Sequence, residues 1–306
     1  MGVQLILIAA VCATFSNYFM RRSIDVHRST TTFLVIQLFL SCIVAIFLNP
    51  VRLNSYSWSF SMAAFGLAAG IILGFMMRSL GKALEVGPPG LTFAMVNSAS
   101  VMPGLLMALI FGAQFGYYYT KAHAIGSILV VGGLFWAGWK LQHIPNKKRW
   151  LTFAILAFVL HMTGLAWMQW RALFIKFPDT TGLLLNFDME DVKSQWFLPM
   201  LFFGAFLVQV WNAFQSKRRF PEKREIIYGF LGGVANGAAT FFLMLSTEYS
   251  SSWEHAMIFP IFAVTIIILC NVWGQWFYKE KVNWWANALC VIGLFIGTMD
   301  WSVFNK

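Results

Sequence analysis

Long apolar stretches alternate with short polar connections along the whole chain. A helix needs about 20 predominantly apolar residues to cross the hydrocarbon core of a membrane. The apolar stretches reach this length, and their short connections favour packing of successive helices as neighbours. The pattern predicts ten transmembrane helices, at residues 2–20, 29–49, 57–81, 88–112, 120–142, 150–173, 195–216, 226–246, 253–275 and 281–303.

The composition agrees with this pattern. Of the 306 residues, 59% are hydrophobic and only 11% are charged, whereas soluble domains carry about 25% charged residues. A water-soluble fold of this length could not cover its surface with so few charges. We therefore expect an all-α polytopic membrane protein. The four cysteines lie within apolar runs and lack metal-ligand spacing, so we expect no metal site.

Basic residues are unevenly shared between the connections. The odd-numbered connections hold 16 of the 22 Lys and Arg residues, the even-numbered ones hold 5, and Lys306 is the last. Basic residues favour cytoplasmic loops, so this bias predicts that both termini lie outside a bacterial-type inner membrane. It also explains the net charge of +10 without nucleic acid as a partner. The longest connection, 174–194, is predicted to be an acidic loop outside the membrane.

A set of four residues recurs at a constant offset of 163 positions. The first copy is Gly66, Gly70, Gly74 and Glu85, and the second is Gly229, Gly233, Gly237 and Glu248. Such duplication is typical of transporters built from two homologous halves. Because five helices per half is an odd number, the second half must insert upside down. We predict an inverted repeat of residues 1–145 and 146–306, in which the glycine faces serve helix packing and could also slide during transport.

The turns and internal prolines of the two halves resemble those of a known family. Each half has a short turn rich in Gly, Pro or Ser after its third helix and a proline within its fourth. The residues concerned are Ala83, Leu84, Gly87, Pro88, Pro89, Gly90 and Pro103 in the first half, and Leu245, Ser250, Ser251, Ser252 and Pro260 in the second. An acid follows the ninth helix, in Lys279-Glu280-Lys281, whereas Tyr117 takes that position in the first half.

With the helix count and the repeat, these residues resemble the drug/metabolite transporter superfamily, in its ten-helix form (EamA-like and sugar-permease-like members). The resemblance implies alternating access of two halves around a central site. It also implies a substrate among sugars, amino acids, nucleotide derivatives, drugs or lipid-linked sugars, without deciding between them.

Polar side chains at membrane depth are costly and tend to face the interior of a helix bundle. For each of them, contact with substrate and hydrogen bonding between helices are alternative interpretations. A central histidine is either a proton relay or a neutral hydrogen-bonding partner, and a tryptophan either stacks on a substrate or anchors the helix at the interface. The predicted substrate-binding residues are Asn17, Asn97, Ser98, His161, Trp167, Asn236 and Thr240.

Two residues at the start of the ninth predicted helix are candidates for proton coupling. Glu254 and His255 are scarce titratable groups near membrane depth. Since an acid in the first turn is also favoured by the helix dipole, Glu254 has a purely structural interpretation too. We expect no cofactor other than a coupling proton.

These observations favour a secondary active transporter that moves a small polar organic metabolite across the membrane. The metabolite is expected to be sugar-like, or like an amino acid or nucleotide. A flippase for a lipid or a lipid-linked sugar on the same fold is the alternative. No phosphate-binding loop, metal-ligand spacing or nucleophile motif occurs, so we do not expect an enzyme. The expected partners are the substrate and the lipid bilayer, and both a monomer and a homodimer remain open.

Overall fold

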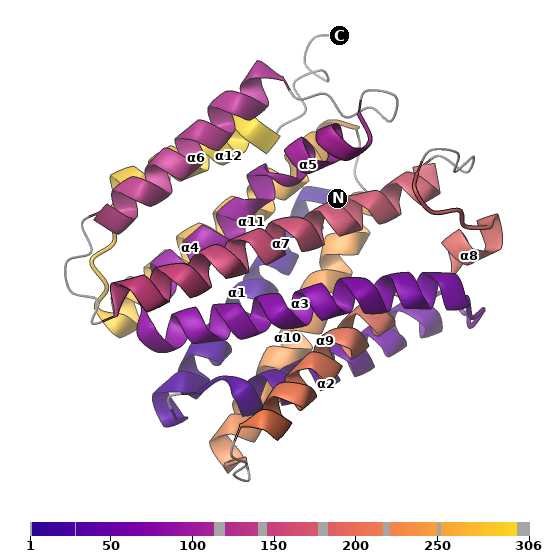
Figure 1. The fold of residues 1–306 in the computed structure, drawn as a ribbon, viewed down its shortest axis with the longest axis horizontal. Coiled ribbons are helices and arrows are strands. Elements are labelled where there is room, and N and C mark those ends of the chain that lie inside the picture. Colours follow the sequence, from indigo (N-terminus) through magenta and orange to yellow (C-terminus); the bar gives the residue numbers. More distant parts are fainter. Residues whose placement is uncertain are drawn as a thin grey trace.

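The computed structural model describes residues 2–27, 29–112, 120–139, 146–176, 183–216, 221–249 and 252–298. These residues form helices and short connections, with no β-strand among them. Most of the long helices lie side by side, and α1 and α10 cross them at a steeper angle (Figure 1). The helices are α1 (Gly2–His27), α2 (Thr31–Ile46), α3 (Phe60–Val86), α4 (Pro89–Ser98), α5 (Pro103–Ile110), α6 (Lys121–Trp139), α7 (Lys147–Lys176), α8 (Met189–Lys193), α9 (Phe197–Gln215), α10 (Lys223–Glu248), α11 (Ser252–Tyr278) and α12 (Trp284–Thr298).

Seven stretches of the described chain are helical, long enough and apolar enough to cross a membrane. Two shorter apolar helical stretches, Lys121–Leu134 and Trp284–Gly297, accompany them. The fold is therefore that of an all-α polytopic membrane protein, as the hydrophobic pattern predicts. The seven stretches are Gly2–Val26, Thr31–Val51, Phe60–Val86, Lys147–Arg171, Phe197–Gln215, Lys223–Ser246 and Ile261–Tyr278.

The fourth predicted helix, 88–112, is interrupted. It consists of α4, a single 3₁₀ turn at Ala99–Val101, and α5, which begins at Pro103. Proline has no backbone N–H to continue a helix, but it is well suited to the first turn of a new one. The break between α4 and α5 follows from the position of Pro103 in the first turn of α5. By contrast, α11 continues through Pro260 without interruption.

Both glycine triplets lie where helices approach closely. A Cβ atom on Gly66 would lie 2.5 Å from the carbonyl oxygen of Phe197, and one on Gly70 would meet the carbonyl oxygen of Leu201. These atoms belong to the backbone of α9, which cannot move aside as a flexible side chain can. The second triplet packs in the same way against α2, where a Cβ on Gly233 would lie 2.7 Å from the carbonyl oxygen of Gln37. The predicted role in close helix packing is confirmed.

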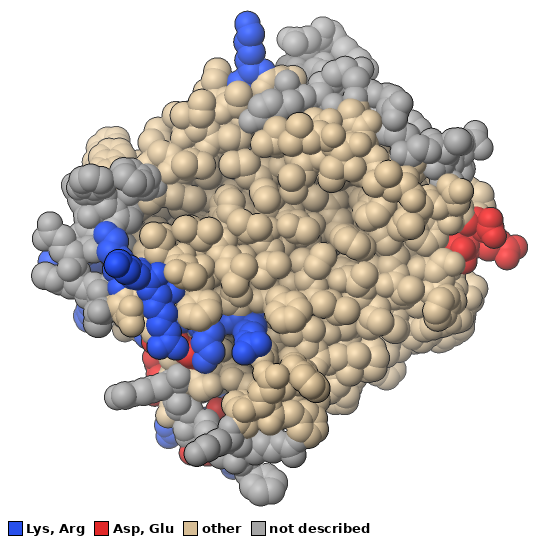
Figure 2. Space-filling view, in the orientation of Figure 1, with Lys and Arg blue, Asp and Glu red and all other residues tan. Residues whose placement is uncertain are grey.

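Charged side chains gather at opposite ends of the bundle. Figure 2 shows a broad surface without Lys, Arg, Asp or Glu between a group of basic residues and the acidic residues of α8. We call the end of the bundle that carries the basic residues the basic end. Here α1, α3 and α11 finish, and α4 and α7 begin. At the other end Ser59, the N-cap of α3, donates its hydroxyl hydrogen to Asp191 of α8. The surface between the two ends is suited to contact with lipid.

Candidate functional site

The candidate residues on α10 take part in a hydrogen-bond chain between helices. The Asn236 side-chain amide donates to Ser41 Oγ on α2 at 3.1 Å, and the Ser41 hydroxyl donates to the carbonyl oxygen of Gly233 at 3.0 Å. Thr240 donates to the carbonyl oxygen of Asn236 at 3.0 Å. In this arrangement Asn236 links α10 to α2. Of the two interpretations of this residue, the structure thus shows the hydrogen bond between helices.

The candidates on α4 lie next to the break in the fourth segment. Asn97 donates to the carbonyl oxygen of Phe93 at 2.8 Å, and Ser98 donates to that of Ala94 at 2.7 Å. Ser98 is fully buried, whereas Asn97 is half-buried. Two residues after Ser98, Ser100 Oγ is shielded from solvent and makes no hydrogen bond within the described structure. The break therefore holds one unpartnered hydroxyl close to two polar side chains that bond only within their own helix.

The other interior candidates lie on α1 and α7. Asn17 donates to Cys270 Sγ on α11, at an N–S distance of 3.7 Å. His161 is half-buried at the middle of α7 and makes no hydrogen bond to another described residue. Trp167 lies in an aromatic cluster with its ring centroid 5.1 Å from that of Phe65 and 5.2 Å from that of Trp170. Trp167 Nε1 is buried and unpartnered in the described structure.

The structure does not gather all seven predicted substrate residues into one hydrogen-bonded group. Asn236 and Thr240 are hydrogen-bonded to each other, and Asn97 and Ser98 are adjacent in sequence, but the others have separate neighbours. The two coupling candidates, Glu254 and His255, fall in the first turn of α11, and their side chains lie outside the described residues.

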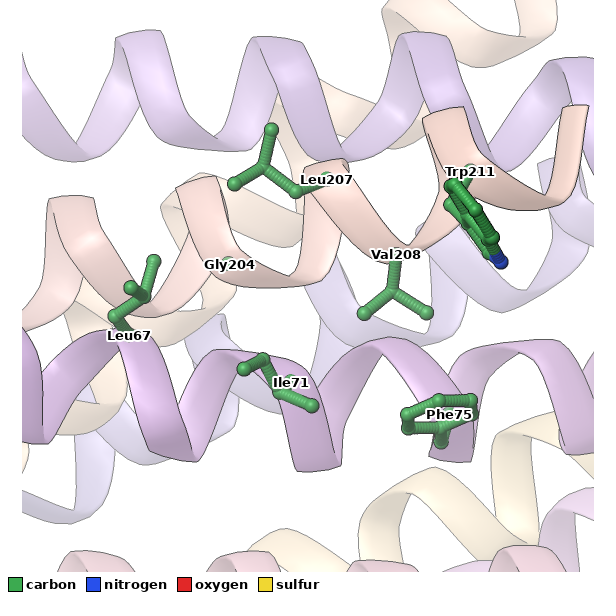
Figure 3. A pocket seen from close by; sticks show the side chains of 7 residues that line it. All are labelled: Leu67, Ile71, Phe75, Gly204, Leu207, Val208 and Trp211. Carbon is green, nitrogen blue, oxygen red and sulfur yellow. The ribbon is translucent and has the colours of Figure 1, made fainter. Parts of the chain in front are cut away.

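A shallow groove between α3 and α9 is apolar almost throughout (Figure 3). It opens outward, since Trp211 at its margin is 66% exposed. Such a surface offers nothing to orient a sugar or an amino acid, but it matches the chemistry of a lipid chain. The groove is lined by Leu67, Ile71, Phe75, Gly204, Leu207, Val208 and Trp211.

A group of polar residues at the basic end was not among the predicted site residues. It is centred on Glu280, which follows α11 and whose Oε2 atom accepts a hydrogen bond from the Gly90 N–H at 2.9 Å. From α1, Arg21 donates to the carbonyl oxygen of Leu84 at 2.7 Å. The Tyr278 hydroxyl donates to Asp25 Oδ2 at 2.6 Å. Three helices, α1, α4 and α11, thus meet through polar contacts.

The environment of Glu280 opposes its charge. Burial raises the pKa of the Glu280 carboxyl to about 7, although the Gly90 hydrogen bond and the nearby Arg21 guanidinium act in the opposite direction. The residue as a whole is half-buried, and its Oε1 atom is shielded from solvent without a partner in the described structure. A carboxyl of this kind changes protonation near neutral pH, as a proton-coupling group must.

The sequence offers some indication of this group. The acid after the ninth helix and the Gly87–Gly90 turn both belong to the family resemblance, but they are 190 residues apart, and no spacing rule joins them. Among the described residues, no cluster of His, Cys, Asp and Glu could hold a metal ion.

The chain matches no model of a known protein family, and no curated protein matches it. The fold thus defines the class, an α-helical polytopic membrane protein.

Proposed function

We propose that this protein is a secondary active transporter of the drug/metabolite transporter type. It moves a small polar organic metabolite by alternating access of two inverted five-helix halves, residues 1–145 and 146–306. The ten membrane segments of this proposal are α1, α2, α3, α4 with α5, and α6 in the first half, followed by α7, α9, α10, α11 and α12 in the second.

The pattern of the most extensive helix contacts carries the proposal, because these contacts are unchanged when the two halves are exchanged. Helix α1 packs against α10, and their counterparts α7 and α3 also pack together. The contact of α2 with α10 corresponds to that of α9 with α3, and the contact of α1 with α11 corresponds to that of α7 with α4. The pairs α2 with α9, α4 with α11, and α6 with α12 correspond to themselves. A chance bundle of helices would have no reason to follow this rule.

Helix direction supports inversion of the second half. The contacts of Gly66 with Phe197 and of Gly74 with Val208 indicate that α3 and α9 run parallel. Their counterparts α10 and α2 are also parallel. Helix α3 ends at the basic end with Lys82 and Glu85, whereas α10 begins there, since Tyr228 stacks on Phe19 just before Arg21. Counterparts pointing in opposite directions are what an inverted repeat requires.

The break between α4 and α5 is the best-supported part of a central substrate site. Broken helices near the middle of the membrane leave backbone groups free for substrates in transporters of this architecture. The 3₁₀ turn that contains Ser100 is contacted by α6, α7, α11 and α12, which come from both halves. A substrate hydroxyl or amide at this position would supply the partner that Ser100 Oγ lacks. Asn97, Ser98 and His161 are proposed to complete the site.

We propose the orientation of the bundle in the membrane from the distribution of its basic residues. The basic end is placed in the cytoplasm of a bacterial-type cell, and both termini are placed outside. On this assignment α8 and its acidic residues face the exterior.

Transport in reconstituted vesicles tests the proposal. A thermal-shift screen of the purified protein against sugars, amino acids and nucleotides identifies a stabilising solute, since a ligand that binds the folded state raises its stability. Counterflow of that solute, radiolabelled, into vesicles is then expected for the wild type and is expected to be reduced in Ser100→Ala. Ser61→Ala, on α3 near the acidic end, is the matched serine control. Absence of exchange for every solute in the panel would contradict the proposal.

The groove between α3 and α9 favours a flippase for a lipid or lipid-linked sugar as the second candidate. Its apolar, outward-facing lining suits a lipid chain. Fluorescent-lipid translocation in the same vesicles separates the two functions. A flippase would move the lipid probe and leave the soluble solutes where they are, whereas the leading proposal expects the reverse.

A further inference from the structure

The beginning of α4 is attached to the connection that follows α11. Glu280 Oε2 accepts a hydrogen bond from the Gly90 N–H in the first turn of α4. The backbone N–H of Glu280 donates to the carbonyl oxygen of Gly274 at 3.3 Å, which folds the connection back onto α11. The carboxylate therefore caps α4 from the opposite half of the chain, where it also interacts favourably with the positive end of the helix.

The attachment depends on the absence of a side chain at Gly90. A Cβ atom there would lie 2.6 Å from Glu280 Oε2 and 2.7 Å from Asn271 Oδ1. Two oxygen atoms thus crowd the same face of α4, and both are acceptors. Glu280 Oε1 is shielded from solvent and has no partner in the described structure, as is also true of Asn271 Nδ2. With the Asn271 amide in this orientation, its oxygen and Glu280 Oε2 are two acceptors on the shared face, where the Gly90 N–H is a donor to Glu280 alone.

The charged groups around Glu280 are already engaged with one another. On α1, Arg21 lies over the Tyr278 ring with its guanidinium carbon 4.9 Å from the ring centroid. Arg22 lies 3.4 Å from Asp25, which also accepts the Tyr278 hydroxyl hydrogen. The two lysines that flank Glu280, Lys279 and Lys281, are exposed.

On α3, Lys82 pairs with Glu85 rather than with Glu280. Helix α4 itself carries no charged residue, and the basic residues that open α7, Lys147, Lys148 and Arg149, are exposed. Within the described structure no basic side chain lies within ion-pair distance of Glu280, so its buried charge is stabilised by one hydrogen bond, by the start of α4 and by the more distant Arg21 guanidinium.

We propose that Glu280 is a proton-binding site and that its protonation loosens the attachment of α4 to the connection after α11, by weakening the bond to Gly90 while the carboxyl itself stays buried. A proton from the solution at the basic end binds a carboxylate oxygen, which forms an O–H bond and removes the negative charge. The neutral carboxyl is a weaker acceptor for Gly90, and it no longer interacts with the helix dipole. Its O–H instead supplies the donor that the crowded oxygen atoms lack.

Loosening of the start of α4 also affects the break in the fourth segment, because α4 connects Gly90 with that break. Gly90 lies near the start of this ten-residue helix, and Asn97 and Ser98 lie at its end. A change in how α4 is held would therefore alter the position of the residues assigned to the substrate site. This part of the inference rests on the proposed function, and it assigns to Glu280 the coupling role for which Glu254 and His255 are the candidates by sequence.

Glu85 provides a matched control within the same protein. It too receives a hydrogen bond from the start of a helix, since the Thr30 N–H donates to Glu85 Oε1 at 3.2 Å next to α2. Unlike Glu280, it has an ion-pair partner, with Lys82 Nζ 2.8 Å from Glu85 Oε2. Both acids lie at the basic end, so a change specific to Glu280 is not a general effect of removing a carboxylate there.

Infrared difference spectroscopy tests proton binding directly, without any transport. The full-length protein is placed in lipid nanodiscs and titrated from roughly pH 5 to 9, a range in which ordinary carboxyls stay ionised for the most part. We expect a protonated-carboxyl C=O band with a midpoint near neutral pH in the wild type and in Glu85→Gln. The band should be absent from Glu280→Gln. Persistence of the band in Glu280→Gln, or its absence from the wild type, would overturn the assignment.

Hydrogen–deuterium exchange at one fixed alkaline pH tests the loosening of α4. Glu280→Gln imitates the neutral carboxyl, so the amides at the start of α4 are expected to exchange about two- to fivefold faster than in the wild type. Residues 121–139 of α6 serve as the internal reference. Equal protection of α4 in the two proteins would refute the loosening.

Transport provides the last distinction. If the wild type transports, its uptake should respond to a pH gradient and that of Glu280→Gln should not, while exchange at equal pH continues in both. A pH response that persists in the variant would refute the coupling role. If neither protein transports any solute but the infrared band behaves as expected, the proton site stands and the proposed function fails.

Discussion

Asn236 on α10 and Ser41 on α2 are joined by a hydrogen bond of 3.1 Å that links the two halves of the chain. The Ser41 hydroxyl in turn donates a hydrogen bond to the carbonyl oxygen of Gly233 in the backbone of α10. The bond lies beside the close contact of Gly233 with α2. A polar chain and a glycine contact therefore fix the same pair of helices.

The hydrogen bond between Ser41 and Asn236 predicts that substitutions of these two residues have coupled effects on stability. Ser41→Ala and Asn236→Ala are each expected to destabilise the protein by about 1 kcal/mol, the usual size for a hydrogen bond between membrane helices. Because both remove the same bond, the double variant should lose less stability than the two single losses combined. Thermal unfolding in detergent measures this. Additive losses, or loss of solute binding by Asn236→Ala with unchanged stability, would instead assign Asn236 to the substrate.

The glycine contacts predict a sharp difference between positions. Gly70→Ala places a methyl group against the backbone of Leu201, so we expect a loss of about 1–3 kcal/mol. Gly132→Ala, on α6, is the matched control because a Cβ there meets nothing within 4 Å. Its replacement should preserve or slightly raise stability, since alanine favours the helix more than glycine does. Thermal unfolding and size-exclusion profiles compare the two, and equal losses would contradict the packing argument.

Much of the fold could be predicted from the sequence because lipid imposes one dominant requirement, an apolar surface of membrane length. The apolar pattern therefore locates the helices, and the 163-residue offset identifies the two glycine faces. The interruption at Ala99–Val101 is less predictable, because Pro103 is compatible with both a kinked helix and a new helix. Proline restricts its own backbone but does not decide between these outcomes.

The candidate site was less predictable, because hydrogen-bond partners depend on tertiary packing. The sequence leaves Asn236 with two interpretations, and only its position opposite Ser41 reveals an interhelical bond. Likewise, the contact of Glu280 with Gly90 joins residues from opposite halves of the chain. Polarity at membrane depth identifies residues that need a partner, but it does not indicate which partner each one finds.

The raised pKa of Glu280 predicts a pH-dependent stability. With a value of about 7 in the folded state against an ordinary 4.5, the folded protein binds the proton more tightly than the unfolded one. Stability from this group is therefore fully present below about pH 4.5 and is lost as the pH rises to about 7, with no further change above. The linkage limit is about 3 kcal/mol, and we expect less because the residue is half-buried.

Replacement of the acid isolates this contribution. Glu280→Gln removes the titrating group, so the unfolding temperature in nanodiscs should fall less steeply between those pH values than that of the wild type. Glu85→Gln retains Glu280 and should keep the slope. A wild-type slope that survives in Glu280→Gln would assign the dependence to another group.

The charge distribution predicts which end of the bundle faces the cytoplasm. Glu190 on α8 and Lys281 after α11 are exposed at the two ends, and each can be replaced by cysteine after the four native cysteines are changed to serine or alanine. A membrane-impermeant maleimide applied to intact cells should label Glu190→Cys at once and Lys281→Cys only after permeabilisation, because basic residues favour the cytoplasmic side. The cysteine-free protein provides the background. Labelling of Lys281→Cys alone in intact cells would reverse the orientation, and labelling of both would show that the chain inserts in two directions.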